Sequence, residues 1–196
     1  MARASSLFFL IYFYTSIVFA YGVEAGMLSF NEEDQMTVLG ETRALQTTVY
    51  GGNINFDKWF PKKLKYKDKI WTRSYKYGLL GGAGVGRAHV TPKHNDITFT
   101  QTNLLAYWIY AGPGIRYTLA ESNVEVGLIA PIYFRSIDYK LPATNTSFNN
   151  KTRLIPSIGF ELVWGYNQRF NITQRMTFAI GPKVSPIWMA GVCYEF

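Results

Sequence analysis

The sequence predicts an all-β fold, an antiparallel up-and-down transmembrane β-barrel of eight strands in a single domain. Apolar and polar residues alternate through several segments, and aromatic residues make up 17% of the chain. Beyond the N-terminal leader, every long apolar stretch is interrupted by a proline, a glycine pair or a charge, which argues against membrane-spanning helices. The mean hydropathy of -0.03 is compatible with a membrane barrel, because its outward apolar and inward polar side chains average out.

The alternation is clearest in three segments, residues 124–134, 154–166 and 188–196. Successive side chains of a strand point to opposite faces, so a barrel in contact with lipid shows an apolar residue at every second position. In the second segment one face contains Phe160 and Trp164, and the opposite face contains Gly159 and Glu161. The other two segments divide in the same way, which predicts one bulky apolar face and one small or charged face.

Aromatic residues near the strand ends separate a membrane barrel from a water-soluble one. A soluble sandwich or barrel also alternates, with its apolar face turned inward. Here Trp164, Trp188 and Tyr194 fall near the ends of predicted strands, where membrane barrels have aromatic girdles at the lipid–water interfaces. The alternative, a secreted soluble β-barrel that binds a small apolar ligand, would place Phe160, Trp164 and Trp188 in its interior.

The N-terminus is predicted to be a secretory signal peptide, residues 1–25, followed by the barrel domain, residues 26–196. Arg3 precedes an apolar run, LFFLIYFYTSIVFA, that ends at Ala20 and is shorter than the roughly 18 to 20 residues needed to span a bilayer. Cleavage after Ala25 or after Ala20 would suit a signal peptidase, and we favour Ala25 on the sequence alone. An uncleaved helical anchor is the competing interpretation.

The last strand carries a resemblance to a known family. Phe196 ends the chain, and Tyr194, Val192, Ala190 and Trp188 occupy the alternate positions before it. This pattern resembles the C-terminal strand signature of bacterial outer-membrane β-barrels, and the stretch YAGPGIRY at residues 110–117 also looks like a strand of the small eight-stranded, OmpA- and OmpW-like class. The resemblance implies recognition of the terminal strand by the barrel-assembly machinery, a location in the Gram-negative outer membrane, and contact with outer-membrane lipids and lipopolysaccharide.

The strand count follows from the rule that successive strands of an up-and-down barrel run in opposite directions. With a periplasmic C-terminus, six strands are assigned to residues 75–88, 104–119, 124–139, 154–167, 173–184 and 188–196. The connections at 120–123 and 168–172 are short and lie at one end, whereas 89–103 and 140–153 are longer and lie at the other. Two further strands from region 36–60, joined by a turn at residues 51–53, would complete eight.

Five ionisable residues fall on the inward face by this phase: Arg116, Glu125, Arg135, Glu161 and Lys183. A narrow barrel leaves little room beyond side chains, so inward charges are expected to pair with one another in the lumen. Arg116 and Glu125 flank the same tight turn and are predicted to form a diagonal cross-strand pair. A gate or narrow ion path is the alternative use of the same residues.

No motif predicts catalysis, a metal site or a cofactor. Cys193 is the only cysteine, which excludes an intrachain disulfide and a cysteine-based metal cluster. His89, His94 and Asp96 are too few for a convincing metal or hydrolase site, and no GxSxG elbow is present. The glycine-rich stretch 81–87 lacks the Lys-Ser/Thr ending of a phosphate loop and is interpreted as close packing. An outer-membrane lipid-modifying enzyme, a lipid hydrolase or acyl-modifying enzyme, remains the alternative to a non-enzymatic role.

The net charge of +7 includes a lysine-rich stretch, KKLKYKDK at residues 62–69. Such a stretch can meet anionic lipid headgroups, lipopolysaccharide phosphates or nucleic acid, and we interpret it as a solvated loop without a nucleic-acid partner. Three glycosylation sequons begin at Asn145, Asn150 and Asn171. Together these features predict a structural or surface-binding protein, and they leave its ligand and oligomeric state open.

Overall fold

The computed structural model describes residues 22–38, 41–63, 74–92, 103–119, 123–138, 146–148, 152–165, 169–181 and 183–195. The described residues form strands, whose bounds are β1 Gly22–Val38, β2 Glu41–Lys63, β3 Ser74–Pro92, β4 Asn103–Thr118, β5 Val124–Ile129, β6 Ile132–Asp138, β7 Thr146–Phe148, β8 Thr152–Gly165, β9 Phe170–Ala179 and β10 Ile187–Glu195. No helix in this described part is long and apolar enough to cross a membrane.

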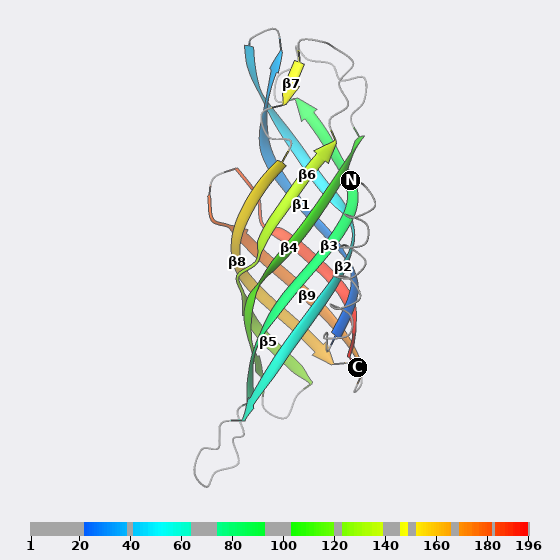
Figure 1. The fold of residues 1–196 in the computed structure, drawn as a ribbon, viewed down its shortest axis with the longest axis vertical. Helices are drawn as coiled ribbons and strands as arrows, with labels where there is room; N and C mark the ends of the chain where they lie inside the picture. Colours follow the sequence, from blue (N-terminus) through cyan, green and yellow to red (C-terminus); the bar gives the residue numbers. More distant parts are fainter. Residues whose placement is uncertain are drawn as a thin grey trace, which may run out of the picture.

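The strands close into a ring (Figure 1). Neighbouring strands pair antiparallel as β1–β2, β2–β3, β3–β4, β8–β9 and β9–β10, and β10 pairs with β1 from Gly22↔Glu195 to Ser29↔Trp188. β5 and β6 are two halves of one strand, because both lie between β4 and β8, and Pro131, which lacks a backbone N–H, separates them. The hydrogen-bonded ring therefore has eight members, which confirms the predicted fold class.

The topology distinguishes two ends of the ring, here called the proximal end and the distal end. The proximal end holds the start of β1, the end of β10 and the β4–β5 turn, which Leu119 N closes by donating to Val124 O at 3.0 Å. The distal end holds the β1–β2, β3–β4, β6–β8 and β9–β10 connections. At the distal end the short strand β7 pairs with β1, from Met36↔Phe148 to Val38↔Thr146, within the predicted outer loop 140–153.

The predicted turn at residues 51–53 is wrong. These residues lie in the middle of β2, which runs for 23 residues and pairs with β1 from Val38↔Glu41 to Gly22↔Asp57. Gly51 faces Gly86 across the β2–β3 ladder, and a Cβ on Gly51 would lie 2.4 Å from the Gly86 Cα. These glycines allow two backbones to approach closely, a role that sequence inspection confuses with a turn.

β1 begins at Gly22, so residues 22–25 of the predicted signal peptide lie within the barrel. They pair on both sides, with β2 and with β10, and Glu24 is buried in the lumen. Several other predicted boundaries shift by a few residues. β9 starts at Phe170, inside the predicted turn 168–172, while positions 139, 167 and 196 lie outside the described residues.

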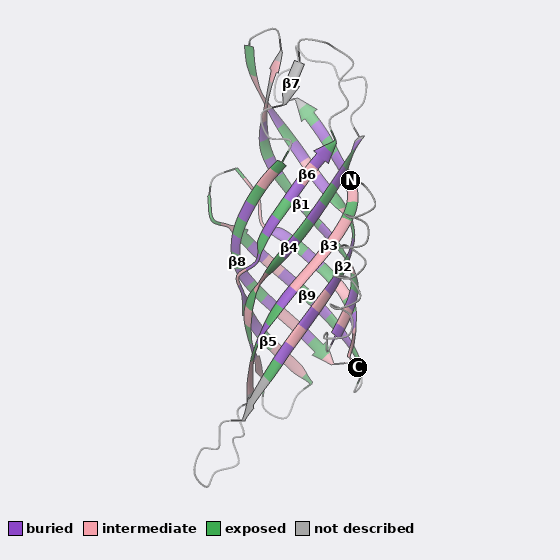
Figure 2. Ribbon diagram, viewed as in Figure 1, coloured by how far each residue is buried: buried purple, intermediate pink, exposed green. Residues whose placement is uncertain are grey.

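Exposure alternates along the strands as predicted, and Figure 2 shows this as alternating green and purple segments. Phe160, Trp164 and Trp188 point outward and are 59%, 51% and 59% exposed. The soluble-barrel alternative required these three side chains in the interior, and that placement is wrong. Large apolar side chains on the outer face are the arrangement that a hydrocarbon environment favours.

The outward apolar side chains form a belt that ends before the distal ends of the longest strands. On β1 the outward residue Met27 belongs to the belt, whereas Asn31 and Glu33, one and two outward positions beyond Ser29, are polar. On β3 the change falls between Val85 and Arg87. The distal parts of β1, β2 and β3 therefore project beyond the belt as a polar extension; in Figure 1 the blue β1 and the light blue start of β2 reach highest, and the green end of β3 lies below them.

Candidate functional site

The lumen contains two clusters of charged side chains. The first, here called the proximal cluster, consists of Glu24, Asp57, Arg116, Glu161 and Arg175. Glu161 lies at its centre: Arg116 Nε donates to Glu161 Oε2 and Arg175 Nε donates to Glu161 Oε1, both at 2.6 Å. All three side chains are at most 2% exposed. The Glu161 carboxylate is therefore shared by two buried guanidinium groups, one at each of its oxygens.

Strand register and one glycine build this arrangement. Arg175 faces Glu161, Glu161 faces Gly127, and Gly127 faces Arg116, so the four residues form one row across β9, β8, β5 and β4. A Cβ on Gly127 would lie 3.2 Å from Arg116 Cγ and 3.3 Å from Glu161 Oε2. The absence of a side chain at this position lets Arg116 reach across β5 to Glu161.

Two further acids complete the proximal cluster. Asp57 lies 3.0 Å from Arg116 Nη2, and Glu24 lies 2.8 Å from Arg175 Nη2. Asn55 Nδ2 donates to Glu24 at 2.7 Å, and Trp59 Nε1 donates to Asp57 at 2.7 Å. Each buried acid therefore has a guanidinium and a neutral donor beside it, which is what burial of a charge requires.

The distal cluster consists of Glu32, Asp34, Arg135 and Arg153. Glu32 pairs with Arg135 and lies 3.7 Å from Arg153, while Asp34 lies 3.7 Å from Arg135. β1 and β6 stand on opposite sides of the eight-membered ring, so the Glu32–Arg135 pair crosses the whole lumen. Side chains from opposite walls meet here, and the barrel interior is filled at this level.

Apolar and aromatic side chains separate the two clusters. On β1, Leu28 and Phe30 lie between Glu24 and Glu32 and are 1% and 4% exposed. On the opposite wall, Tyr133 packs against Tyr110 with the rings tilted and their centroids 4.9 Å apart, and the Tyr133 hydroxyl lies 3.2 Å from Thr177 Oγ1. The described lumen is thus layered: charged, then apolar and aromatic, then charged again.

Four of the five predicted lumen residues lie in or at the rim of the lumen, in two separate groups. Arg116, Glu161 and Arg135 lie in the two clusters, and Glu125 lies at the proximal rim, 2.6 Å from Lys76 and 3.9 Å from Arg116. The principal partner of Arg116 is therefore Glu161 rather than the predicted Glu125. Lys183 is outside the lumen, in an exposed turn between β9 and β10.

The sequence prediction missed six charged residues of the two clusters: Glu24, Glu32, Asp34, Asp57, Arg153 and Arg175. Glu24 had been assigned to the leader, and Glu32 and Asp34 lay in a region without assigned strands. Arg175, however, precedes the outward residue Met176, so the same phase that selected Glu161 also selects Arg175. The signal for that residue was present in the alternation.

The remaining candidate chemistry is dispersed. His89 is exposed on the outward face of β3, and His94 and Asp96 lie outside the described residues. The described ranges contain no group of three His, Cys, Asp or Glu side chains that could hold a metal ion. Cys193 is buried with a free thiol. Asn171 is buried too and donates to Glu195 at 2.7 Å, so this sequon is inaccessible in the folded barrel, whereas Asn145 and Asn150 lie outside the described residues.

The glycine-rich stretch 81–87 lies in β3, where it packs against aromatic rings of β4. A Cβ on Gly84 would lie 2.4 Å from the Trp108 indole, and one on Gly82 would lie 2.9 Å from the Tyr110 ring. Such distances leave no space for any side chain. The stretch is a packing surface inside the lumen.

The terminal strand places its alternate residues on the outer face. Trp188 and Val192 are 59% and 53% exposed, and Tyr194 packs edge-on against Phe170 with centroids 5.1 Å apart. Phe196 lies outside the described residues. The described part of the signature is therefore on the side that faces lipid in a membrane barrel.

Comparison with solved structures finds small outer-membrane proteins. The crystal structure of Ail, the attachment invasion locus protein of Yersinia pestis, aligns over 88% of this chain and 98% of its own, with 13% identity and a TM-score of 0.43. Neisserial surface protein A aligns over 90% of this chain and 98% of its own, with 12% identity and a TM-score of 0.41. The chain is similar to these proteins, and its own strand pairing shows a closed ring of eight antiparallel strands.

Ail has also been solved in a phospholipid bilayer nanodisc, and that structure aligns with 14% identity and a TM-score of 0.42. No protein-family model and no curated protein sequence matches this chain. At these identities the likeness concerns the fold alone, and the fold of this chain stands on its own strand pairing.

Proposed function

We propose that this protein is an integral outer-membrane β-barrel with a structural or surface-binding role and no enzymatic activity. The observation that carries the proposal is the closed ring of eight strands whose outer face is an apolar belt and whose lumen holds two charged clusters. A barrel with no open sheet edge and an apolar exterior meets the requirements of the hydrocarbon core.

The polar extension is the surface that the proposal assigns to contacts outside the membrane. Its outward positions on β1 and β2 include Gln35, Thr37 and Gln46, which offer hydrogen-bonding groups. The edge of β1 beyond β10 is covered, because Glu33 N donates to Lys183 O and Ser185 N donates to Asn31 O, both at 2.7 Å. A polar surface on a rigid, edge-protected ribbon suits recognition of a partner.

Insertion by the barrel-assembly machinery is part of the same proposal. It rests on the terminal pattern of Trp188, Val192, Tyr194 and Phe196, of which the first two are exposed on the outer face of the ring. Phe196→Ser should lower the amount of barrel assembled in cells while leaving refolding in detergent unchanged. Phe60→Ser, an equivalent change at an exposed position of β2 near the same end and away from β10, is the matched control and should affect assembly less.

Cell fractionation with a gel-mobility test decides the main proposal. A closed barrel recovered in the outer membrane should migrate differently before and after boiling in detergent, because the folded ring resists unfolding at room temperature. Recovery in a soluble fraction, or identical mobility in both samples, would contradict the proposal. The enzymatic alternative makes a separate prediction, hydrolysis of labelled outer-membrane lipids that is lost in His89→Ala.

A further inference from the structure

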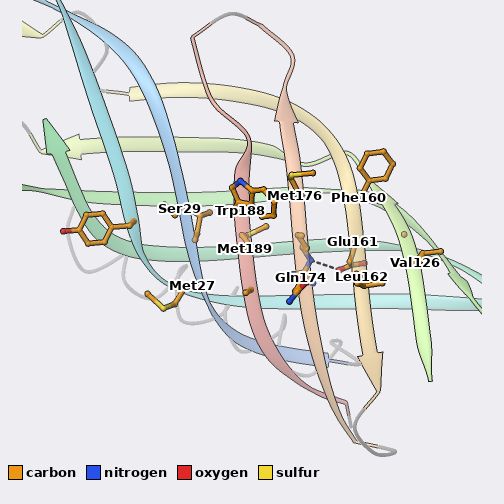
Figure 3. A pocket seen from close by; sticks show the side chains of 15 residues that line it. Met27, Ser29, Val126, Phe160, Glu161, Leu162, Gln174, Met176, Trp188 and Met189 are labelled. Carbon is orange, nitrogen blue, oxygen red and sulfur yellow. Dashed lines mark hydrogen bonds and ion pairs between the residues drawn. The ribbon is translucent and has the colours of Figure 1, made fainter. Parts of the chain in front are cut away.

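The outer face of the belt is hollowed over six neighbouring strands, β2, β1, β10, β9, β8 and β5. A groove of about 620 Å³ lies there, and Figure 3 shows the side chains around it. Met27, Tyr50 and Trp188 line it from β1, β2 and β10, and Phe160 lines it from β8, while the small Ala190 leaves its floor open. The lining is mainly apolar and the groove is open to the outside, which suits a flexible hydrocarbon chain.

A polar cleft continues the groove toward the distal end. It measures about 520 Å³ and is lined by Asn31, Glu33, Gln46, Lys183 and Ser185 among others. Ser29 of the groove and Asn31 of the cleft are successive outward positions on β1, so the two hollows adjoin. The boundary between them is the level at which the outward face changes from apolar to polar, where lipid headgroups begin.

Lys183 is held at this boundary by its backbone. Its carbonyl accepts a hydrogen bond from Glu33 N at 2.7 Å, and its φ of 84° lies in the left-handed region that non-glycine residues rarely adopt. The side chain is exposed. The turn therefore places Lys183 in the lining of the polar cleft that adjoins the groove.

The chemistry of the cleft selects among headgroups. Lys183 supplies one cation for a phosphate, and the amides of Asn31 and Gln46 supply neutral hydrogen-bonding groups. Glu33 places a carboxylate at the same cleft, which opposes a headgroup that consists of phosphate alone and accepts hydrogen bonds from hydroxyl groups. A phosphorylated sugar matches this combination better than a simple phospholipid headgroup.

We propose that the groove and the cleft together bind one phosphorylated glycolipid, the lipid anchor of lipopolysaccharide. An acyl chain lies along Met27, Trp188 and Phe160, the phosphate lies at Lys183, and the sugar hydroxyl groups face Asn31 and Glu33. This inference rests on the proposed function, because the outer membrane is where such a lipid occurs.

Native mass spectrometry of the detergent-purified protein tests the proposal. The protein is incubated with equal amounts of deep-rough lipopolysaccharide and phosphatidylglycerol, and the retained lipids are counted by mass. One lipopolysaccharide molecule should be retained in preference to phosphatidylglycerol. Lys183→Gln should weaken that retention about tenfold, whereas Lys58→Gln, the same change near the proximal end, should not.

The groove has its own matched pair of variants. Ala190→Trp fills the floor and should abolish retention, whereas Ala111→Trp adds the same bulk at an exposed belt position on β4, the opposite side of the ring, and should leave it intact. The gel-mobility test confirms that each variant folds. If a tryptophan variant does not fold, Lys183→Gln and Lys58→Gln still test the proposal.

The proposal would be overturned if the two variants of each pair had equal effects, or if phosphatidylglycerol were retained as strongly as lipopolysaccharide. If the protein fractionates as a heat-modifiable outer-membrane barrel but retains no lipopolysaccharide, only this inference fails. If it is absent from the outer membrane, the proposed function fails first.

Discussion

At the scale of single residues, Glu161 holds the proximal cluster together. Glu161→Gln leaves Arg116 and Arg175 buried with too little negative charge, and breaking such a buried pair costs about 3–5 kcal/mol. Urea unfolding in detergent micelles should therefore show a large loss of stability. Glu125→Gln at the rim, where the side chain is 13% exposed, should cost about 1 kcal/mol or less. Similar losses for both variants would contradict the central role of Glu161.

The lipid-facing phase gives a second prediction at this scale. Leu128 is 49% exposed on the outer face of β5, and Leu128→Arg should cost about 2–4 kcal/mol if that position lies near the bilayer midplane. Gly127→Ser, on the opposite face, should cost less, although its added atoms must share space with the Arg116 side chain. Refolding titrations into lipid vesicles measure both, and equal small effects would show that the assigned phase is wrong.

The sequence predicted the facing of residues well and their partners less well. Alternation has a strict period of two, so it placed Arg116, Glu161 and Arg135 inward without knowledge of the fold. Partner choice depends on which strands meet across the lumen, and alternation carries no information about that. Lys183 was misplaced because the β9 ladder ends at Ala179, so the two-residue period no longer applied at that position.

At the scale of elements, β1 bears on where the leader is removed. Cleavage after Ala25 would remove residues 22–25, their pairs with β2 and β10, and Glu24, which neutralises Arg175. We therefore propose cleavage after Ala20, with Val18 at the minus-three position, and a mature chain that starts at Tyr21.

The intact mass of protein recovered from the membrane fraction checks this proposal. Ala20→Leu should impair processing, because a signal peptidase requires a small residue before the cut. Ala25→Leu changes only an exposed outward position of β1, so the mature variant should differ in mass from the unmodified mature protein by the Ala-to-Leu change alone. A mature chain that starts at Gly26 would refute the assignment.

Elements near the C-terminus were easier to predict than those near the N-terminus for a physical reason. β8 and β10 present large apolar residues on one face and small or charged residues on the other, so their period is visible. β1 and β2 extend beyond the belt, and their distal outward positions are polar. The difference in polarity between inward and outward residues is therefore weak in the distal parts of β1 and β2, the strands that were predicted wrongly.

At the scale of the whole molecule, layering of the lumen explains how a narrow barrel tolerates nine buried or partly buried charged residues across its two clusters. Each cluster contains both signs, and an apolar and aromatic layer lies between them. An ion that crosses the lumen would have to displace paired guanidinium groups and then pass Leu28, Phe30 and Tyr133 without hydration. The arrangement therefore favours a structural ion-pair network over a gate or ion path.

The final prediction is that the barrel does not conduct ions. Purified protein inserted into planar bilayers should give no conductance steps above the protein-free baseline. The double variant Glu32→Ala with Arg135→Ala removes the pair that crosses the lumen, but it leaves the aromatic layer and the proximal cluster in place, so the current should still stay at baseline. Regular conductance steps from the unmodified protein would show that the lumen opens, and loss of those steps in Tyr133→Trp would place the path through the aromatic layer.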